Sequence, residues 1–133
     1  MRSWKTCSNG RLKTRNCKRM PTIFTKIINR ELPGDIVYED ELCVAFKDIH
    51  PAAPTHILIV PKKEIPRLAD AKEEDQALLG HLLLAVGKVA RQLGVDDAFK
   101  VAIANGEQAG QTVFHLHLHL MAGKRASEKE MLG

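Results

Sequence analysis

The segment from Val113 to Met121 places histidine and apolar residues in strict alternation, and this pattern constrains the fold more than any other part of the chain. Successive side chains of a β-strand point to opposite faces, so a period of two predicts a strand. His115, His117 and His119 would then share one face. The other face would carry apolar side chains that pack beneath a helix, namely Phe114, Leu116, Leu118 and Leu120. The chain therefore requires a sheet with one covered face and one face that presents imidazoles.

The remaining periodicities predict an α+β domain with an antiparallel sheet of about five strands, one long helix and one short helix. The short helix would be capped by Thr22 and run to about Arg30. The long helix would run from about Ala71 to Leu93, with Asp70 as its N-cap, and would cover one face of the sheet. The strands other than the histidine strand are expected at Ile36–Tyr38, Leu42–Lys47, His56–Val60 and Phe99–Ala104.

Charge divides the 133-residue chain into a leader and a body. Residues 1–20 contain seven basic residues and no acidic one, whereas the rest has 13 basic and 16 acidic residues. Such a leader is typical of a mitochondrial transit peptide, or else it precedes a true start at Met20. We expect residues 1–20 to be disordered and residues 21–133 to form one domain, with a tail from about residue 124.

Composition also bounds the partners and the compartment. The mildly acidic body argues against a nucleic-acid polymer as partner, and no apolar run reaches the ~18–20 residues of a membrane span. The three cysteines form no C-x-x-C pair and no disulfide framework. A reducing, cytoplasmic setting fits best, with an organellar (mitochondrial) one as the alternative if the leader is a genuine transit peptide.

Three interpretations of the histidine row are open. The histidines could be polar residues that face solvent. They could instead bind a metal ion, although His115 and His119 would lie about 13 Å apart along a strand, at roughly 3.3 Å per residue. We favour nucleophilic catalysis, because a neutral imidazole is a good nucleophile near neutral pH and a neighbouring imidazole can donate a proton.

The loop before the histidines has the composition of an anion site. Gly106 and Gly110 permit backbone conformations that aim N–H groups at an anion, and Gln111 and Thr112 add side-chain donors. Donors beside a row of histidines suit a phosphorus centre, where charge stabilisation and positioning dominate catalysis.

The histidine row resembles the signature of the histidine triad family of nucleotide hydrolases and transferases, His-φ-His-φ-His-φ-φ with φ apolar, and specifically its Hint branch. Four further segments resemble the same branch in the same order: Ile23–Ile28, Ala45–Pro51, Ala53–His56 and Val60–Lys63. The resemblance covers about residues 21–123. It implies a homodimer joined through the long helix and a continuous ten-stranded sheet.

The resemblance also implies roles for individual residues. His117 would be the nucleophile of a covalent nucleotidyl intermediate, His119 would contact the phosphate and assist proton transfer, and His115 would hold the nucleophile's environment. His56 would be a more distant fourth histidine of the site, and Asp48 would hydrogen-bond the ribose hydroxyls. The phosphate and leaving group would be bound by Asn105, Gln111 and Thr112. The purine would lie in an apolar slot formed by Ile23, Phe24, Phe46 and Ile49. The chemistry would require no metal and no cofactor.

Simpler interpretations of several positions stay open from the residues alone. The four slot residues could belong to the core, and Asp48 and Asn105 could be turn residues. We interpret His50 and His81 as structural or solvent-exposed.

The chain also departs from the family pattern. Thr22 and Thr25 stand where some relatives carry paired cysteines that suggest structural zinc, so we predict no such site. The loop of residues 105–111 looks about one residue shorter than in close relatives, which blurs the assignment of Asn105. The tail lacks the aromatic and proline pattern of some relatives, which leaves the leaving-group specificity undefined.

The resemblance therefore implies a hydrolase that cleaves the P–N bond of purine nucleoside 5′-phosphoramidates, and of related aminoacyl-adenylate-like compounds, with an AMP-type ligand. Two alternatives remain. The chain could be a dinucleoside polyphosphate hydrolase or nucleotidyl transferase of the same family. It could also be a nucleotide-binding interaction protein with incidental hydrolysis.

Overall fold

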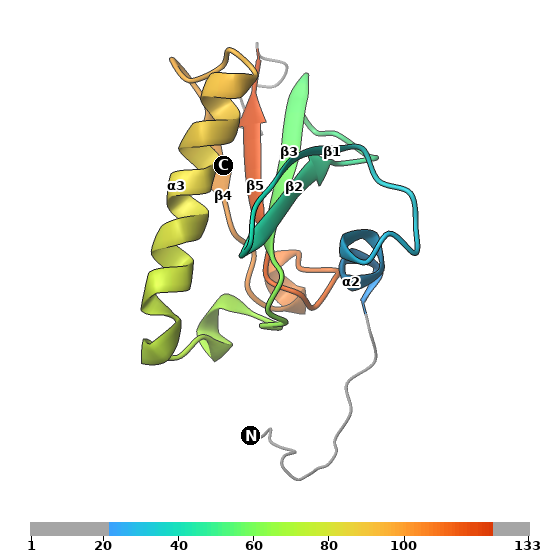
Figure 1. The fold of residues 1–133 in the computed structure, drawn as a ribbon, viewed down its shortest axis with the longest axis vertical. Coiled ribbons are helices and arrows are strands. Elements are labelled where there is room, and N and C mark those ends of the chain that lie inside the picture. Colours follow the sequence, from blue (N-terminus) through green and yellow to red (C-terminus); the bar gives the residue numbers. More distant parts are fainter. Residues whose placement is uncertain (1–21, 124–133) are drawn as a thin grey trace, which may run out of the picture.

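The computed structural model describes residues 22–123 as a five-stranded antiparallel sheet with a helix on each face (Figure 1). The strands lie in the order β1-β2-β3-β5-β4. Their bounds are Ile36–Glu39 for β1, Cys43–Lys47 for β2, Thr55–Pro61 for β3, Lys100–Ala102 for β4 and Leu118–Ala122 for β5. The predicted α+β class and the antiparallel sheet are confirmed. The expected leader of residues 1–20 and the tail from about residue 124 lie outside the described residues.

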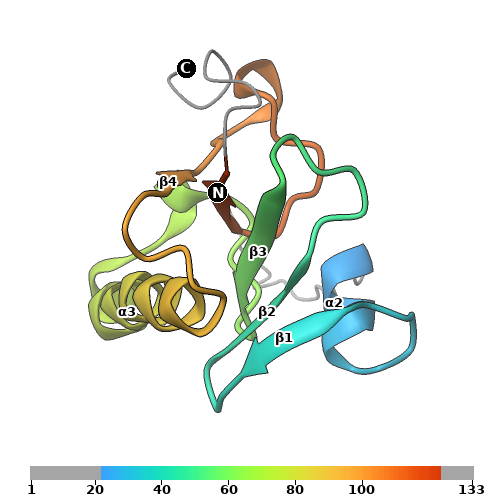
Figure 2. The same ribbon diagram turned by 90° about the horizontal axis from the view of Figure 1, so that it is seen from above.

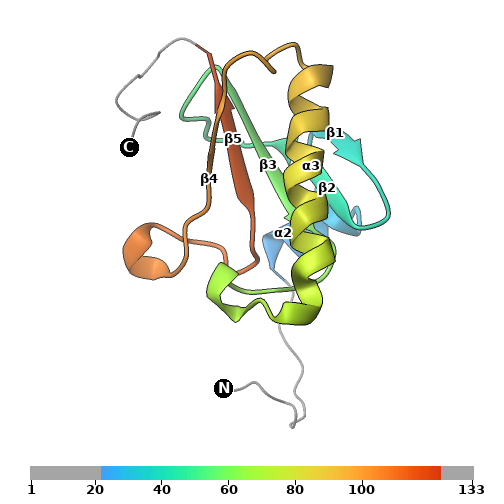
Figure 3. The same cartoon turned by 90° about the vertical axis from the view of Figure 1, so that its left-hand side faces the viewer.

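The two helices cover opposite faces of the sheet. The long helix α3 (Gln76–Gln92) lies along one face, and the short helix α2 (Ile23–Ile28) lies against the other (Figures 2 and 3). Alternation along β2 and β3 divides their buried side chains between two clusters. The cluster under α3 contains Cys43, Ala45, Ile57 and Ile59. The cluster under α2 contains Val44, Phe46, Leu58 and Val60.

The predicted apolar row beneath the long helix is present at three of its four positions. Leu116, Leu118 and Leu120 are at most 2% exposed and belong to the cluster under α3. Phe114 is 44% exposed, so that part of the prediction is wrong. The physical reason is that residues 113–117 do not pair as a strand, because the Leu116 N–H donates to the Ile65 carbonyl in the connection after β3.

The long helix begins later than predicted, at Gln76. Two 3-10 helices precede it, η1 (Leu68–Asp70) and η2 (Glu73–Asp75). Asp70 is not the N-cap, because its carboxylate pairs with Arg67. The buried carboxylate of Asp75 instead accepts the Lys72 N–H and the Lys63 ammonium group, and the α-helix begins directly after this residue.

Other boundaries differ by a few residues. The predicted strand at Phe99–Ala104 shortens to β4, and a 3-10 helix η3 (Glu107–Ala109) lies in the loop that follows. The predicted cap of α2 is confirmed, since Thr22 Oγ accepts the Thr25 N–H at 3.1 Å. Among residues 22–123, no helix is long and apolar enough to cross a membrane.

Candidate active site

Four histidines meet on the α2 side of the sheet, and we call His56, His115, His117 and His119 the histidine cluster. His119 lies on β5 opposite Leu58 of β3, and His56 lies on β3 opposite Met121 of β5. The rings of His56 and His119 have centroids 5.2 Å apart, and those of His117 and His119 are 4.9 Å apart. The predicted grouping of the histidines therefore holds for His117 and His119, although His117 precedes the regular strand.

The orientation of His117 is fixed by the backbone of the same segment. Its Nδ1 lies 2.7 Å from the His115 carbonyl oxygen, which can only accept a hydrogen bond. Nδ1 therefore carries the proton of the neutral ring, and Nε2 carries the lone pair. Nε2 has no hydrogen-bond partner among the described residues. Burial lowers the pKa of His117, which keeps the ring neutral near neutral pH.

His115 is buried and anchored on both sides of its ring. Its Nε2 donates to the Pro61 carbonyl at 2.8 Å. Its Nδ1 lies 3.1 Å from Thr22 Oγ and 3.4 Å from Thr25 Oγ. Because Thr25 Oγ donates to Glu64 at 2.7 Å, the Thr22 hydroxyl is the donor that suits a neutral His115. The start of α2 thus holds the residue whose carbonyl orients His117.

A second chain of hydrogen bonds sets the tautomer of His119. The Ala52 N–H donates to His56 Nδ1 at 2.9 Å, so the proton of neutral His56 lies on Nε2. His56 Nε2 then donates to His119 Nδ1 at 2.9 Å. Neutral His119 consequently carries its proton on Nε2. The cluster presents a bare nitrogen on His117 and an N–H on His119.

Burial dominates the protonation of this pair. It lowers the pKa of His119 to about 4, with smaller contributions from the neighbouring rings of His117 and His56. Burial also lowers the pKa of His56, and the nearby Asp48 carboxylate offsets part of that effect. Both rings are neutral near neutral pH without a bound anion.

Asp48 lies at the edge of the cluster. Its Oδ1 accepts the His50 N–H at 2.8 Å, and its Oδ2 lies 3.5 Å from His56 Nε2. Asp48 is therefore a turn residue and also lies close to the histidine cluster. Its side chain is 20% exposed, which leaves part of the carboxylate accessible to a ligand.

The four predicted slot residues divide into two buried rings and two exposed aliphatic side chains. Phe24 and Phe46 are buried and pack edge to face with centroids 5.5 Å apart, and Phe24 also contacts the His117 ring edge to face at 4.8 Å. Ile23 is 45% exposed and Ile49 is 79% exposed. The core interpretation thus holds for the two phenylalanines and not for the two isoleucines.

The predicted phosphate donors occupy different environments. Gln111 is buried, accepts the Gly106 N–H at 2.8 Å and donates to the Pro66 and Val113 carbonyls at 2.7 and 3.0 Å. Its amide therefore organises the loop, with both N–H groups engaged by backbone. Asn105 Oδ1 accepts the Ala69 N–H at 2.7 Å, and Thr112 is exposed.

The two loop glycines adopt the backbone conformations for which glycine was expected. Gly106 has φ of 94° and Gly110 has φ of 102°, values that other residues rarely adopt. They bracket η3 and let the chain turn back toward Gln111, whose own N–H donates to the Gly106 carbonyl at 3.0 Å.

Sequence patterns do not indicate the partners that hold the histidines. Glu64, the Pro61 carbonyl and the Ala52 N–H come from connections or strand ends, and each becomes relevant only when β3 and α2 are placed beside the histidines. Of the two remaining histidines, His50 is exposed, and the half-buried His81 is bonded to Asp40. Both agree with the structural or solvent-exposed interpretation.

Two groups of described residues have the ligand types and spacing for a metal ion. One consists of Asp48, His56 and His119 within the histidine cluster. The other consists of Asp40, Cys43 and His81 on the opposite side of the sheet. In the first group the hydrogen bond between the two histidines accounts for the arrangement without an ion.

Comparison with known proteins identifies the family. A family model of the HIT domain matches residues 29–126. The chain belongs to the HIT family. This HIT protein is 59% identical, over 103 residues, to an uncharacterized HIT-like protein of Synechocystis sp., and the match spans 77% of this chain and 90% of the relative.

Solved structures of HIT proteins share the fold. A histidine triad protein from Clostridium difficile superposes with a TM-score of 0.78 at 41% identity, over 84% of this chain and 98% of that one. A HIT family hydrolase from Legionella pneumophila superposes with a TM-score of 0.76 at 37% identity, over 85% of this chain and 97% of that one.

Proposed function

We propose that this HIT protein hydrolyses the P–N bond of purine nucleoside 5′-phosphoramidates through a covalent nucleotidyl group on His117. The observation that carries the proposal is the hydrogen bond from His117 Nδ1 to the His115 carbonyl, which leaves the lone pair on Nε2. A nucleophile needs that lone pair, an oriented ring and a neutral charge state, and all three follow from the contacts of His117. The hydrolase from Legionella pneumophila supports a hydrolytic reaction.

The first step forms a bond from His117 Nε2 to the α-phosphorus and breaks the bond from phosphorus to nitrogen. The departing nitrogen needs a proton, and the Nε2–H of His119 is the donor whose tautomer suits this role. A phosphate anion beside His119 favours the protonated ring and so raises its pKa from the low value of the unliganded site. The second proton comes from solvent and binds Nδ1, which breaks the hydrogen bond from His56 Nε2. Proton transfer then leaves a neutral amine and a neutral His119.

The second step releases the nucleotide. Water attacks phosphorus, its proton passes to His119, and the bond between phosphorus and His117 Nε2 breaks. The products are the nucleoside monophosphate and the free enzyme. Because one ring donates a proton in the first step and takes one in the second, the cycle closes without a further group.

The purine and ribose are assigned to the two exposed apolar residues and the carboxylate near the cluster. Ile23 adjoins Phe24, which contacts His117, and Ile49 adjoins Asp48, which lies near His56. Exposed aliphatic side chains offer apolar area to a purine ring, and the partly accessible Asp48 carboxylate offers an acceptor to ribose hydroxyls.

A homodimer is the second part of this proposal. The outer surface of α3 exposes Leu83 by 59% and Leu84 by 69%, beside the exposed Gly80. β4 lies at the edge of the sheet, where a second copy could extend it to ten strands. Light scattering should give the mass of a dimer, and Leu84→Glu should lower that mass. A monomer at all concentrations would contradict it.

The proposed activity is tested by steady-state kinetics on adenosine 5′-phosphoramidate beside a diadenosine polyphosphate. We expect a higher kcat/KM for the phosphoramidate. His117→Ala should reduce kcat by about a thousandfold or more while nucleotide binding persists. A preference for the polyphosphate would favour the related hydrolase branch. Tight binding with negligible turnover in the wild type would favour an interaction protein.

A further inference from the structure

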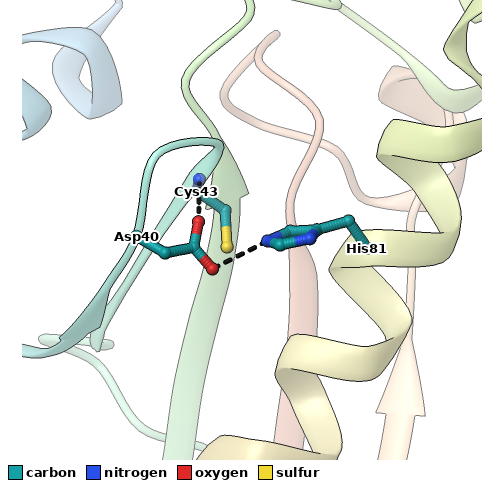
Figure 4. A group of neighbouring side chains, drawn as sticks. All are labelled: Asp40, Cys43 and His81. Atoms are coloured by element: carbon teal, nitrogen blue, oxygen red, sulfur yellow. Dashed lines mark hydrogen bonds and ion pairs between the residues drawn. The ribbon is translucent and has the colours of Figure 1, made fainter.

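Three side chains with different ligand atoms converge between the sheet and α3, away from the histidine cluster. Asp40 lies in the turn between β1 and β2, Cys43 begins β2, and His81 lies on α3 (Figure 4). A carboxylate oxygen, the sulfur and a ring nitrogen all lie within 4.8 Å of one another. Figure 4 shows the carboxylate and the thiol directed toward the imidazole.

The turn is built so that the carboxylate is held in place. Asp40 Oδ1 accepts the N–H groups of Leu42 and Cys43 at 2.8 and 2.9 Å. Its Oδ2 accepts the Tyr38 hydroxyl at 2.8 Å and His81 Nε2 at 2.7 Å. The side chain of Asp40 therefore has little freedom, and the outer oxygen is the one directed at His81. A positioned ligand of this kind lowers the entropic cost of binding an ion.

The arrangement has an inner and an outer part. Cys43 is fully buried in the cluster under α3, whereas the side chains of His81 and Asp40 are 29% and 23% exposed. An ion would approach from the side of the imidazole and the carboxylate and meet the sulfur last.

We propose that Asp40, Cys43 and His81 form a binding site for one zinc-like divalent transition-metal ion. Thiolate, imidazole and carboxylate are the ligands that zinc prefers, with bond lengths of about 2.0–2.3 Å. Three ligands at those lengths in a tetrahedron lie roughly 3.5 Å apart. The most widely separated ligand atoms therefore have to approach by about an ångström, while His81 Nε2 and Asp40 Oδ2, which are 2.7 Å apart, have to separate slightly. Water fills the fourth position, and Tyr38 retains its hydrogen bond to the carboxylate.

Binding exchanges protons for the ion. The Cys43 S–H bond breaks, its proton goes to solvent, and a bond from sulfur to the metal forms. The hydrogen bond from His81 to Asp40 also breaks, the ring proton moves from Nε2 to Nδ1 by exchange with solvent, and the ring binds through Nε2. The ion replaces the hydrogen bond between Asp40 and His81 by a metal bond to each of these residues. It therefore links the turn to α3 and should stabilise the fold. None of these residues belongs to the proposed reaction, so the site does not depend on the proposed activity.

Sequence spacing gives no sign of this site. Asp40 and Cys43 are three residues apart, but His81 lies 38 residues beyond Cys43 on a helix. The three meet only because β2 packs beneath α3.

The test uses the full chain with Cys7→Ser and Cys17→Ser, which leaves Cys43 as its single thiol. Co²⁺ is titrated in place of zinc, because a thiolate bound to Co²⁺ gives a near-ultraviolet charge-transfer band. We expect this band to saturate at one ion per chain, to disappear on addition of Zn²⁺, and to be accompanied by release of at least one proton.

Variants then assign the band. His81→Gln alters a half-exposed residue and should abolish the band while circular dichroism stays that of the folded chain. Cys43→Ser should do the same, and His119→Gln should retain the band because the second candidate group contains no sulfur. Zn²⁺ should raise the thermal midpoint of the parent chain and leave that of His81→Gln unchanged.

The proposal is overturned if the folded parent chain shows no thiolate band at saturating Co²⁺. It is equally overturned if the band survives in His81→Gln, or if Zn²⁺ raises the thermal midpoint of His81→Gln as much as that of the parent chain.

Discussion

Thr22 is expected to support both the stability of the domain and the position of the nucleophile. Its Oγ accepts the Thr25 N–H at 3.1 Å and lies 3.1 Å from Nδ1 of the buried His115. Thr22→Val preserves the shape of the side chain and removes both contacts. Turnover should fall as well, because the carbonyl of His115 orients His117.

The magnitude follows from the two lost contacts. Removal of an N-cap costs about 1 kcal/mol, and a buried group that loses its partner costs about 1–3 kcal/mol. The second cost is reduced because Thr25 Oγ lies 3.4 Å from the same His115 nitrogen. We therefore expect Thr22→Val to lower the free energy of unfolding by about 2 kcal/mol.

Urea denaturation followed by circular dichroism measures this change. Thr22→Ser keeps the hydroxyl and should stay within about 0.5 kcal/mol of the wild type. Thr25→Val keeps the cap, loses the bond to Glu64, and should cost about 1 kcal/mol. If Thr22→Val were as stable as Thr22→Ser, the argument that α2 anchors His115 would fail.

Four further predictions concern pH, the core, the exposed Ile49 and the loop. Burial lowers the pKa of His117 and His119 in the folded state, that of His119 to about 4, so the unfolded chain binds more protons on acidification. The free energy of unfolding should therefore fall as the pH drops from about 7 to about 4, and His119→Gln should flatten that slope. Leu82→Ala, at a fully buried position under α3, should cost about 2–5 kcal/mol in urea denaturation. Ile49→Ala, at a 79% exposed position, should cost under about 0.5 kcal/mol yet weaken nucleotide binding in calorimetry. Gln111→Ala should cost about 3 kcal/mol, because it leaves the Pro66 and Val113 carbonyls and the Gly106 N–H unpaired; a cost no larger than that of Thr112→Ala would refute its role in the loop.

Periodicity predicted the elements whose burial is regular. The alternation around Leu118 and Leu120 and the helical spacing of Leu82, Val86 and Val89 identified the sheet face and the helix that covers it. These patterns succeed because a side chain must point inward at a fixed repeat when one face is buried. The prediction places the start of the long helix too early, because aspartate is a common N-cap residue and Asp70 precedes the apolar repeat. In the structure Asp70 pairs with Arg67, and the residue before the helix is Asp75, whose contact with Lys63 depends on tertiary structure.

The sequence predicts the grouping of the histidines but not their tautomers. Three histidines in alternation indicated a cluster, and two of them do bring their rings together. Their tautomers could not be predicted, because the groups that fix them are backbone atoms of residues 52, 61 and 115. Gln111 shows that residue type alone does not predict where a side chain points. Its amide is expected to face a ligand, but its N–H groups donate to the Pro66 and Val113 carbonyls.

The nucleophilic role of His117 is tested most directly by mass spectrometry of the protein mixed with an adenosine 5′-phosphoramidate and quenched during turnover. The orientation of its ring predicts one added adenylate group per active chain, mapped by peptide fragmentation to His117 and absent from His117→Ala. An adduct on a different histidine, or turnover by His117→Ala at the rate of the wild type, would contradict it.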